Sequence, residues 1–201
     1  MMFPRLCLAL LALSSLAAAS DPGCEELVKP LEDRSKISGK WIFHVGGADT
    51  EEYLKNLKYF HSSWIDIPTV LSDNMTIRFA DRHEEKCLYG HANFSNEGNN
   101  TKLTFHFNST SHDHVGMLLV SCADCLLWIE NTESKKNGEI NMGRQFYLFT
   151  KSGDLAESDL AFFMKQAACL NVLPDFYFAE TKDLCPDEKE AAASKETTQE
   201  Q

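Results

Sequence analysis

The sequence predicts an all-β protein, either a sandwich or a barrel, with one α-helix near its C-terminus. Short strand-like runs between residues 37 and 150 alternate with turn signals rich in Gly, Asn, Asp and Ser. This pattern is typical of antiparallel sheets that are joined by tight turns. The segment that starts at Asp154 instead has apolar residues at helical spacing, which predicts a helix packed on the sheet.

The N-terminus predicts a secreted protein. Arg5 precedes an apolar run from Leu6 to Leu13, and small residues follow it, so residues 1–20 are expected to be a secretory signal peptide. The run is too short to span a bilayer, and we expect a soluble protein of blood plasma or another body fluid, without stable membrane insertion. The formal net charge of −11 disfavours nucleic acid as a partner.

The remaining chain is expected to form one folded domain, residues 21–185, and a disordered charged tail, residues 186–201. An even number of cysteines in a secreted chain favours disulfides, but their spacing leaves the pairing open. These cysteines are Cys24, Cys87, Cys122, Cys125, Cys169 and Cys185. Cys122 and Cys125 flank a predicted tight hairpin, where a disulfide, free thiols, a redox pair and a zinc half-site are the alternatives.

Asparagine sequons supply markers for the outer surface of the sheet. Sequons of the Asn-x-Ser/Thr type begin at Asn74, Asn93, Asn99 and Asn108. A glycan must point to water, so side chains of the opposite parity on the same strand are expected to face inward. The polar and apolar residues of these strands agree with that parity.

The first strand contains a Gly-x-Trp motif. Gly39 allows a kink or a close approach, and Trp41, Phe43 and Val45 are predicted to share one face. Residues 49–58 are predicted to form a short helical turn or lid after this strand.

An inward-facing set follows from the parity of all the strands, and it is mostly apolar and aromatic with a few polar groups, as ligand pockets are. The alternative is that these side chains simply fill a core. The set is Phe43, Ser63, Ile65, Ile67, Ile77, Phe79, Leu103, Phe105, Phe107, Leu127, Gln145 and Tyr147.

The C-terminal helix is predicted to begin with a capping pattern formed by Asp154 and Glu157. One apolar stripe is expected to pack on the sheet, and Pro174 is expected to end the helical region. The stripe consists of Leu160, Phe163, Met164 and Ala167. Residues 175–181 are predicted to be a short extended segment.

The order and spacing of several short segments resemble the orosomucoid (acid glycoprotein) family of lipocalins, over about residues 24–190. The likeness is greatest to the fish plasma members that bind saxitoxin, tetrodotoxin or tributyltin. The segments are Gly39-Lys40-Trp41, Glu51-Glu52-Tyr53, Lys86-Cys87-Leu88-Tyr89, Cys169-Leu170 and Asp183-Leu184-Cys185-Pro186.

This resemblance implies an eight-stranded up-and-down antiparallel barrel with one C-terminal helix on its wall. It implies the disulfides Cys24–Cys169 and Cys87–Cys185, and it leaves the state of Cys122 and Cys125 open. Such a barrel is just wide enough to hold one small ligand.

The family also implies a barrel floor at Gly39 and Trp41 with a cation packed on the indole, here either Arg144 or Lys151. The family's pocket aromatic, its pocket tyrosine and the neighbouring polar residue fall at Phe43, Tyr147 and Gln145.

The pocket's charged residues differ from the family pattern. The family's acidic residue on the third strand is replaced by Phe79, while Asp81 lies two residues on and on the same face. Its pocket arginine falls within residues 103–105 and is lost. Losing the cation while keeping Asp81 favours a neutral or cationic ligand.

We therefore expect a secreted carrier that binds small hydrophobic or cationic ligands such as toxins, xenobiotics or lipophiles, without cofactor or metal. The alternative is a glycan-mediated, immunomodulatory acute-phase protein that acts through a cell-surface receptor. An enzyme is not expected: catalytic motifs are missing, His112 and His114 are predicted to be solvated, and Cys122 and Cys125 are the only candidates for a reactive thiol.

Overall fold

The computed structural model describes residues 23–70, 72–97, 100–107, 110–136, 139–172 and 175–187. Several sequence predictions fall outside these residues: the signal peptide, the sequons at Asn99 and Asn108, the helix-ending Pro174 and nearly all of the charged tail. The side chain of His112 lies outside the described part as well. The side chain of Phe107 is also outside the described part.

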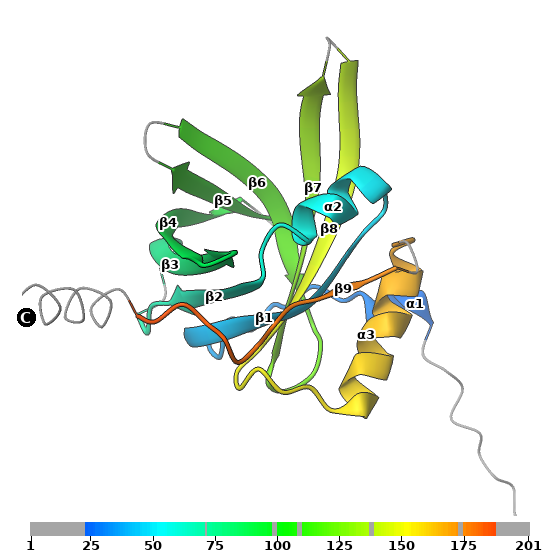
Figure 1. Cartoon of the computed structure of the whole chain (residues 1–201). Helices are drawn as coiled ribbons and strands as arrows, with labels where there is room; N and C mark the ends of the chain where they lie inside the picture. Colours follow the sequence, from blue (N-terminus) through cyan, green and yellow to red (C-terminus); the bar gives the residue numbers. More distant parts are fainter. Residues whose placement is uncertain are drawn as a thin grey trace, which may run out of the picture.

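The described elements are eight long strands, three helices and one short strand (Figure 1). In chain order they are α1 (Cys24–Leu27), β1 (Gly39–Ala48), α2 (Glu51–Leu57), β2 (Ser62–Ile67), β3 (Asn74–His83), β4 (Lys86–Glu97), β5 (Asn100–Phe107), β6 (Thr110–Leu119), β7 (Cys125–Lys136), β8 (Glu139–Thr150), α3 (Glu157–Cys169) and β9 (Tyr177–Phe178). No helix among the described residues is long and apolar enough to cross a membrane.

The sheet closes on itself. Strands β2 to β8 pair with their sequence neighbours, and β1 pairs antiparallel with both β8 and β2. The short β9 adds to β1 near Val45 and Gly46. Every pairing is antiparallel, which confirms the eight-stranded up-and-down barrel, and closure leaves no long exposed sheet edge.

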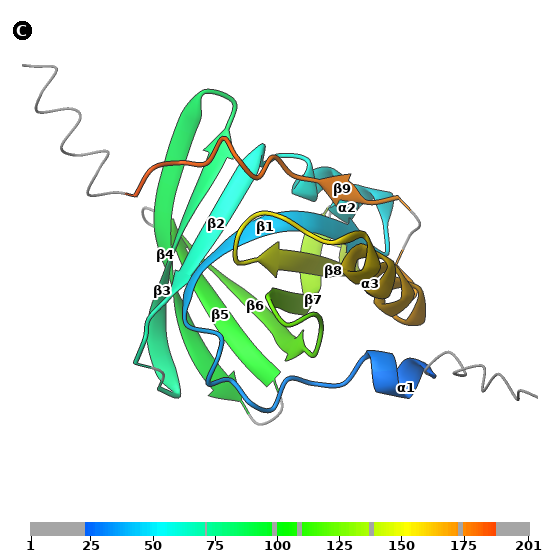
Figure 2. The same cartoon turned by 90° about the horizontal axis from the view of Figure 1, so that it is seen from below.

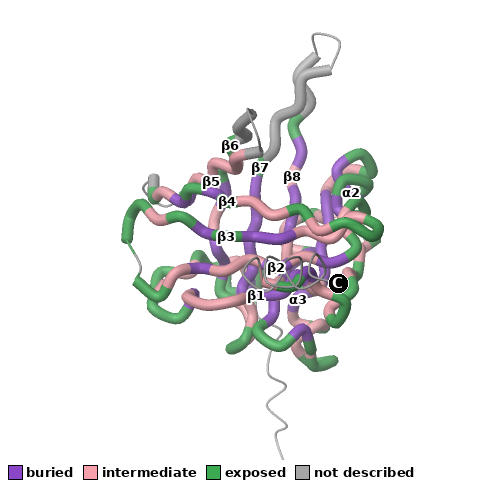
Figure 3. The backbone as a smooth tube through the Cα atoms, turned by 60° about the vertical axis from the view of Figure 1, so that its left-hand side comes forward, coloured by how far each residue is buried: buried purple, intermediate pink, exposed green. Residues whose placement is uncertain are grey.

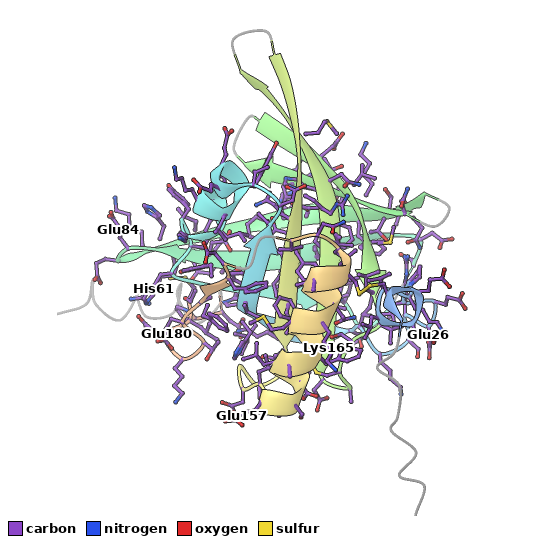
Figure 4. All side chains as sticks on the ribbon, turned by 90° about the vertical axis from the view of Figure 1, so that its right-hand side faces the viewer. Glu26, His61, Glu84, Glu157, Lys165 and Glu180 are labelled. Carbon is purple, nitrogen blue, oxygen red and sulfur yellow. A yellow bond between two sulfur atoms is a disulfide. The ribbon has the colours of Figure 1, made fainter. Side chains whose placement is uncertain are left out.

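Helix α3 covers one outer wall of the barrel, against β1 and β8 (Figure 2). Its Phe163 is fully buried and stacks on Phe146 of β8 with ring centroids 5.0 Å apart. The opposite side of the helix is charged, and Figure 4 shows Glu157 and Lys165 on it. This arrangement confirms the single helix on the wall.

The start of α3 differs from the predicted capping pattern. Ala156 occupies the N-cap position, no side chain caps the helix, and Asp154 lies two residues before it. The backbone N–H groups of Asp159 and Leu160 donate to the Ala156 carbonyl instead.

One register irregularity in β1 corrects the prediction for Val45. The pairing with β8 shifts between Phe43 and Val45, so His44 is an extra residue in that strand. An extra residue reverses the side-chain parity beyond it. Phe43 therefore faces the barrel interior, whereas Val45 is fully buried on the outer wall under α3.

The floor of the barrel is built on Trp41. Its indole N–H donates to the Ile37 carbonyl at 2.6 Å, and the Lys151 ammonium lies 3.9 Å from the ring centroid. Lys151 also donates to the Ser38 carbonyl at 2.6 Å, so it holds the segment just before β1 in place. Arg144, the other candidate, is bonded to the Leu170 carbonyl, and Lys151 is therefore the floor cation.

Three disulfides are present in the described part of the chain. Two join segments that are far apart in the sequence, and the third joins two cysteines at one turn. Cys24–Cys169 ties α1 to the end of α3, and Cys87–Cys185 ties β4 to the C-terminal segment. Both pairs that the resemblance implied are present. Cys122 and Cys125 form a third disulfide at the β6–β7 turn, which decides between the alternatives for that pair.

The C-terminal segment lies across the outer face of β2 (Figure 2). Trp64 points outward there, yet it is only 2% exposed, because the C-terminal segment covers it. Its indole N–H donates to the Cys185 carbonyl of that segment at 2.8 Å. Ser62 donates to the Asp183 carbonyl at 2.7 Å. Buried positions lie mainly in the middle of the strands, and the β3–β4 turn is exposed (Figure 3).

Candidate ligand-binding site

The barrel encloses a cavity of about 310 Å³, at the lower end of the range for small-molecule sites. Its lining is almost entirely aliphatic and aromatic, with three polar groups at Ser63, Asp81 and His114. The lining residues are Phe43, Leu57, Phe60, Ser63, Ile65, Ile67, Ile77, Phe79, Asp81, Phe94, Leu103, Phe105, His114, Leu118, Leu126, Trp128, Tyr147 and Phe149.

The structure brings most of the sequence-predicted set together around this cavity. Ten of those residues line it: Phe43, Ser63, Ile65, Ile67, Ile77, Phe79, Asp81, Leu103, Phe105 and Tyr147. Two groups of rings pack within the lining: Phe79 and Phe105 have centroids 5.4 Å apart, and Phe43 lies 5.6 Å from Phe149, which also lines the cavity.

Leu127 does not belong to the cavity, so its predicted inward orientation is wrong. It is fully buried on the outer wall beneath α3, while Leu126 and Trp128 face inward. Strand β7 is apolar on both faces because α3 covers the outer one, and alternation cannot then reveal which face is inside.

Gln145 is on the inward-facing side of β8, as predicted, but it lies beyond the cavity, toward α2. Its amide donates to the Tyr53 carbonyl of α2 at 3.3 Å, and it is buried where α2 crosses β8. It therefore helps to hold α2 rather than to line the site.

Eight lining residues are additional to the predicted set: Leu57, Phe60, Phe94, His114, Leu118, Leu126, Trp128 and Phe149. Leu57 and Phe60 come from α2 and the segment after it, whose position over the barrel the sequence does not reveal. The alternation along β4 predicts that Phe94 faces inward, and the alternation along β8 puts Phe149 on the same side as Tyr147, although neither was named as a ligand contact.

The cavity holds one carboxylate with few polar neighbours. Asp81 on β3 lies directly across from Ser63 on β2. Burial raises the pKa of Asp81 from 3.8 to about 6, and a hydrogen bond from Ser63 opposes that rise only in part. At neutral pH this carboxylate is therefore ionised in a largely apolar environment.

A second polar group lies on the opposite part of the wall. Glu130 on β7 is 3% exposed and accepts hydrogen bonds from the Tyr147 hydroxyl at 2.9 Å and the Trp128 indole at 2.8 Å. His114 Nδ1 on β6 lies 3.0 Å from the same carboxylate. Three donors from three strands thus satisfy one buried carboxylate.

His114 is therefore not the solvated residue that the sequence predicted. Burial alone would lower its pKa, but the hydrogen bond and charge of Glu130, with Asp113, outweigh burial and raise the pKa. Asp113 faces the other side of β6 and pairs with Lys102. No cluster of metal-ligating side chains exists among the described residues.

Helix α2 lies at the end of the barrel opposite the Trp41 floor, and Figure 1 shows it beside β7 and β8, which extend past it. Its N-cap Thr50 accepts from the Tyr53 amide, and Tyr53, Leu54 and Leu57 are buried against the barrel. Tyr53 rests on Gly143 of β8, where a Cβ would lie 1.9 Å from the tyrosine ring.

Replacing Gly143 with valine is expected to displace Tyr53 and with it α2. Overpacking of this kind costs about 1–3 kcal/mol of stability. Limited proteolysis should then cleave the segment around residues 49–60 faster than in the wild type. The outward substitution Val115→Thr is the control, and equal cleavage of all three proteins would contradict this packing.

Solved structures that are similar to this one include lipocalins. No family model and no curated protein matches the sequence. The structure of the siderocalin Ex-FABP has a TM-score of 0.56 and 14% identity, covering 74% of this chain and 97% of that one. A dog lipocalin allergen has a TM-score of 0.56 and 13% identity, covering 76% and 99%. This chain has the lipocalin fold.

A second siderocalin, reported to have a dual ligand binding mode, matches the lipocalin barrel with a TM-score of 0.58 and 17% identity, covering 78% of this chain and 97% of that one. At such identities the likeness shows the fold alone. The lipocalin architecture predicted from the sequence is confirmed, and ligand chemistry has to be argued from the cavity itself.

Proposed function

We propose that this protein is a secreted carrier that binds a small, mainly apolar ligand with one positively charged group inside the barrel. The observation that carries the proposal is the ionised Asp81 in a cavity whose other lining residues are almost all apolar. A carboxylate in such surroundings is costly unless a positive charge accompanies it.

The protein itself supplies no such charge at Asp81. The described lining residues include no Lys or Arg, and Ser63 is the hydrogen-bond partner of Asp81 there. The other buried carboxylate, Glu130, is already paired with His114. An amine or guanidine on the ligand would compensate Asp81, while the aromatic lining residues would bury the rest of the molecule.

The finer assignment to the orosomucoid family, with toxins or xenobiotics as cargo, belongs to this proposal. Its support is the resemblance of the short segments around Trp41, Cys87 and Cys185 and the presence of disulfides. Secretion and glycosylation are supported by the disulfides and by the exposed sequon residues Asn74 and Asn93.

A titration with three ligands of one carbon skeleton tests the charge preference. An arylpropylamine, the matching arylpropanol and the matching carboxylate are added separately, and the fluorescence of cavity residue Trp128 follows binding. We expect the amine to bind about tenfold more tightly than the alcohol, since an ion pair in partial burial contributes on the order of 1–2 kcal/mol. Tighter binding of the carboxylate, or no binding of any of the three, would refute the proposal.

The affinity for the amine is expected to depend on pH. Only ionised Asp81 attracts the cation, so the affinity falls as the pH is lowered through about 6, by up to tenfold for each further pH unit. Any protonation of His114, whose pKa Glu130 raises, adds positive charge to the cavity and acts in the same direction, and Tyr147 stays neutral because burial and Glu130 raise its pKa. Calorimetric titrations between about pH 5 and pH 8 check this. The alcohol is the control, and parallel profiles for amine and alcohol would contradict it.

A further inference from the structure

We propose that His114 is a second polar recognition point in the cavity, and that the ligand carries a neutral hydrogen-bond acceptor, such as a carbonyl group, at the end away from its cation. This inference rests on the proposed function and adds the ligand class, a cationic aromatic or aliphatic molecule with one remote acceptor. Asp81 and His114 lie on β3 and β6, three strands apart in a closed ring of eight, so they face the ligand from different walls.

The hydrogen bonds around Glu130 fix the orientation of the imidazole. The Trp128 indole can only donate, and it occupies Glu130 Oε2. The Tyr147 hydroxyl and His114 Nδ1 both approach Oε1, at 2.9 and 3.0 Å. Because Glu130 Oε1 is the acceptor for Nδ1, Nδ1 must carry a proton, and Nε2 is the atom left for another partner.

The free edge of the ring faces the cavity. His114 lines the cavity and Glu130 does not, so the edge opposite Glu130 is the one that a ligand would meet. Within the described part of the chain, no hydrogen bond is made by Nε2. Phe105 packs edge-on against the ring at 4.9 Å and restricts its rotation. A half-buried ring nitrogen without a protein partner is a ready contact for a polar ligand atom.

The combined charge of His114 and Glu130 determines which kind of hydrogen-bond acceptor on the ligand is favoured. The hydrogen bond and the charge of Glu130 raise the pKa of His114 and so favour the doubly protonated imidazole, in which Nε2 presents an N–H donor to the cavity. The imidazolium and Glu130 together are neutral, and Asp81 is negative. A carboxylate on the ligand would be repelled by Asp81 with no net positive charge at His114 and Glu130 to offset it, whereas a carbonyl oxygen accepts the hydrogen bond without adding charge.

A set of four ligands separates this contact from the cation contact. The arylpropylamine is prepared with a para-acetyl group and with a para-ethyl group of nearly the same shape, and both forms are also prepared as arylpropanols. Calorimetry gives the dissociation constant of each. We expect the acetyl amine to bind about five- to tenfold more tightly than the ethyl amine, the usual effect of one hydrogen bond.

Variants of the chain then assign the acceptor contact to His114. His114→Phe leaves the Glu130 carboxylate unpaired, so the double variant His114→Phe/Glu130→Gln, which removes both charges, is measured beside it. In the double variant the acetyl advantage should fall below about twofold, because no donor remains at that position. The control His91→Phe alters an exposed histidine on the outer face of β4 and should retain the full advantage.

The preference of each variant for amine over alcohol reports separately on the cation site. If the double variant retains that preference and loses the acetyl advantage, the inference holds. The role of His114 is refuted if the acetyl amine has no advantage in the wild type, or if it keeps its advantage in the double variant. In either case, binding of the ethyl amine to the wild type would still support the proposed function. If neither amine binds the wild type, both proposals fail.

Discussion

Replacing both Cys24 and Cys169 with serine is expected to lower the free energy of unfolding by about 5 kcal/mol. This disulfide links residues 145 apart and closes most of the chain into one loop. The entropy that it removes from the unfolded state grows with loop length, and native strain would reduce the effect. Urea denaturation monitored by circular dichroism measures the loss.

The Cys122–Cys125 disulfide supplies a matched control, because its cysteines are only 3 residues apart. The same relation gives about 2 kcal/mol for the double serine variant of this pair. Both variants lose two sulfur atoms, and none of the four positions is fully buried, so the difference mainly reports loop length. Equal losses of stability in the two variants would contradict the loop-length account of the Cys24–Cys169 disulfide.

Substituting Asp81 with asparagine is expected to have opposite effects on binding and on stability. The affinity for the arylpropylamine should fall by about 10–100-fold, because the ion pair is lost and the carboxamide provides only a dipole. The affinity for the arylpropanol should change little. Calorimetric titration of both ligands measures the two effects.

The same substitution is expected to stabilise the empty protein at neutral pH. The folded-state pKa of Asp81, about 6, lies above the ordinary value of 3.8. The protonated form is thus favoured by folding, and the stability that it contributes below about pH 4 is lost as the pH rises through about 6. Asp81→Asn should therefore add roughly 1–3 kcal/mol at neutral pH and almost nothing near pH 4. Asp66→Asn, on the outer face of β2, is the control, and a gain that does not vary with pH would contradict this account.

The sequence predicts the cavity well wherever one face of a strand meets water. On β3 and β5 the exposed alternates, such as Thr76 and Lys102, mark the outer face, and the structure places Ile77, Phe79, Leu103 and Phe105 inside. The period of two is unambiguous in such strands because only one face is apolar.

The same reasoning fails where tertiary contacts hide the outer face. Both faces of β7 are apolar because α3 covers the outer one, and the predicted inward orientation of Leu127 was therefore wrong. The extra residue at His44 likewise made the predicted orientation of Val45 wrong. No local pattern encodes either effect, since α3 is distant in the sequence and the shift depends on pairing with β8.

The polar groups of the site were only partly predictable. Asp81 could be placed from its parity with Phe79, whereas His114 ends a polar run, residues 110–114, that suggests solvent exposure. Its parity with Leu118, four residues on and inside the barrel, is the signal that indicates the inward face. The role of Glu130 emerges only when β6, β7 and β8 are side by side.

Native mass spectrometry of the full chain with the arylpropylamine tests most directly whether the ligand occupies the barrel. We expect one ligand per chain in the wild type, and we expect none in Ile65→Trp, because Ile65 lines the cavity and the larger indole would occupy it. Val115→Trp adds the same ring at an exposed position of β6 and should bind one ligand as before. Undiminished binding to a folded Ile65→Trp variant would show that the ligand binds elsewhere and would contradict the carrier function proposed for this cavity.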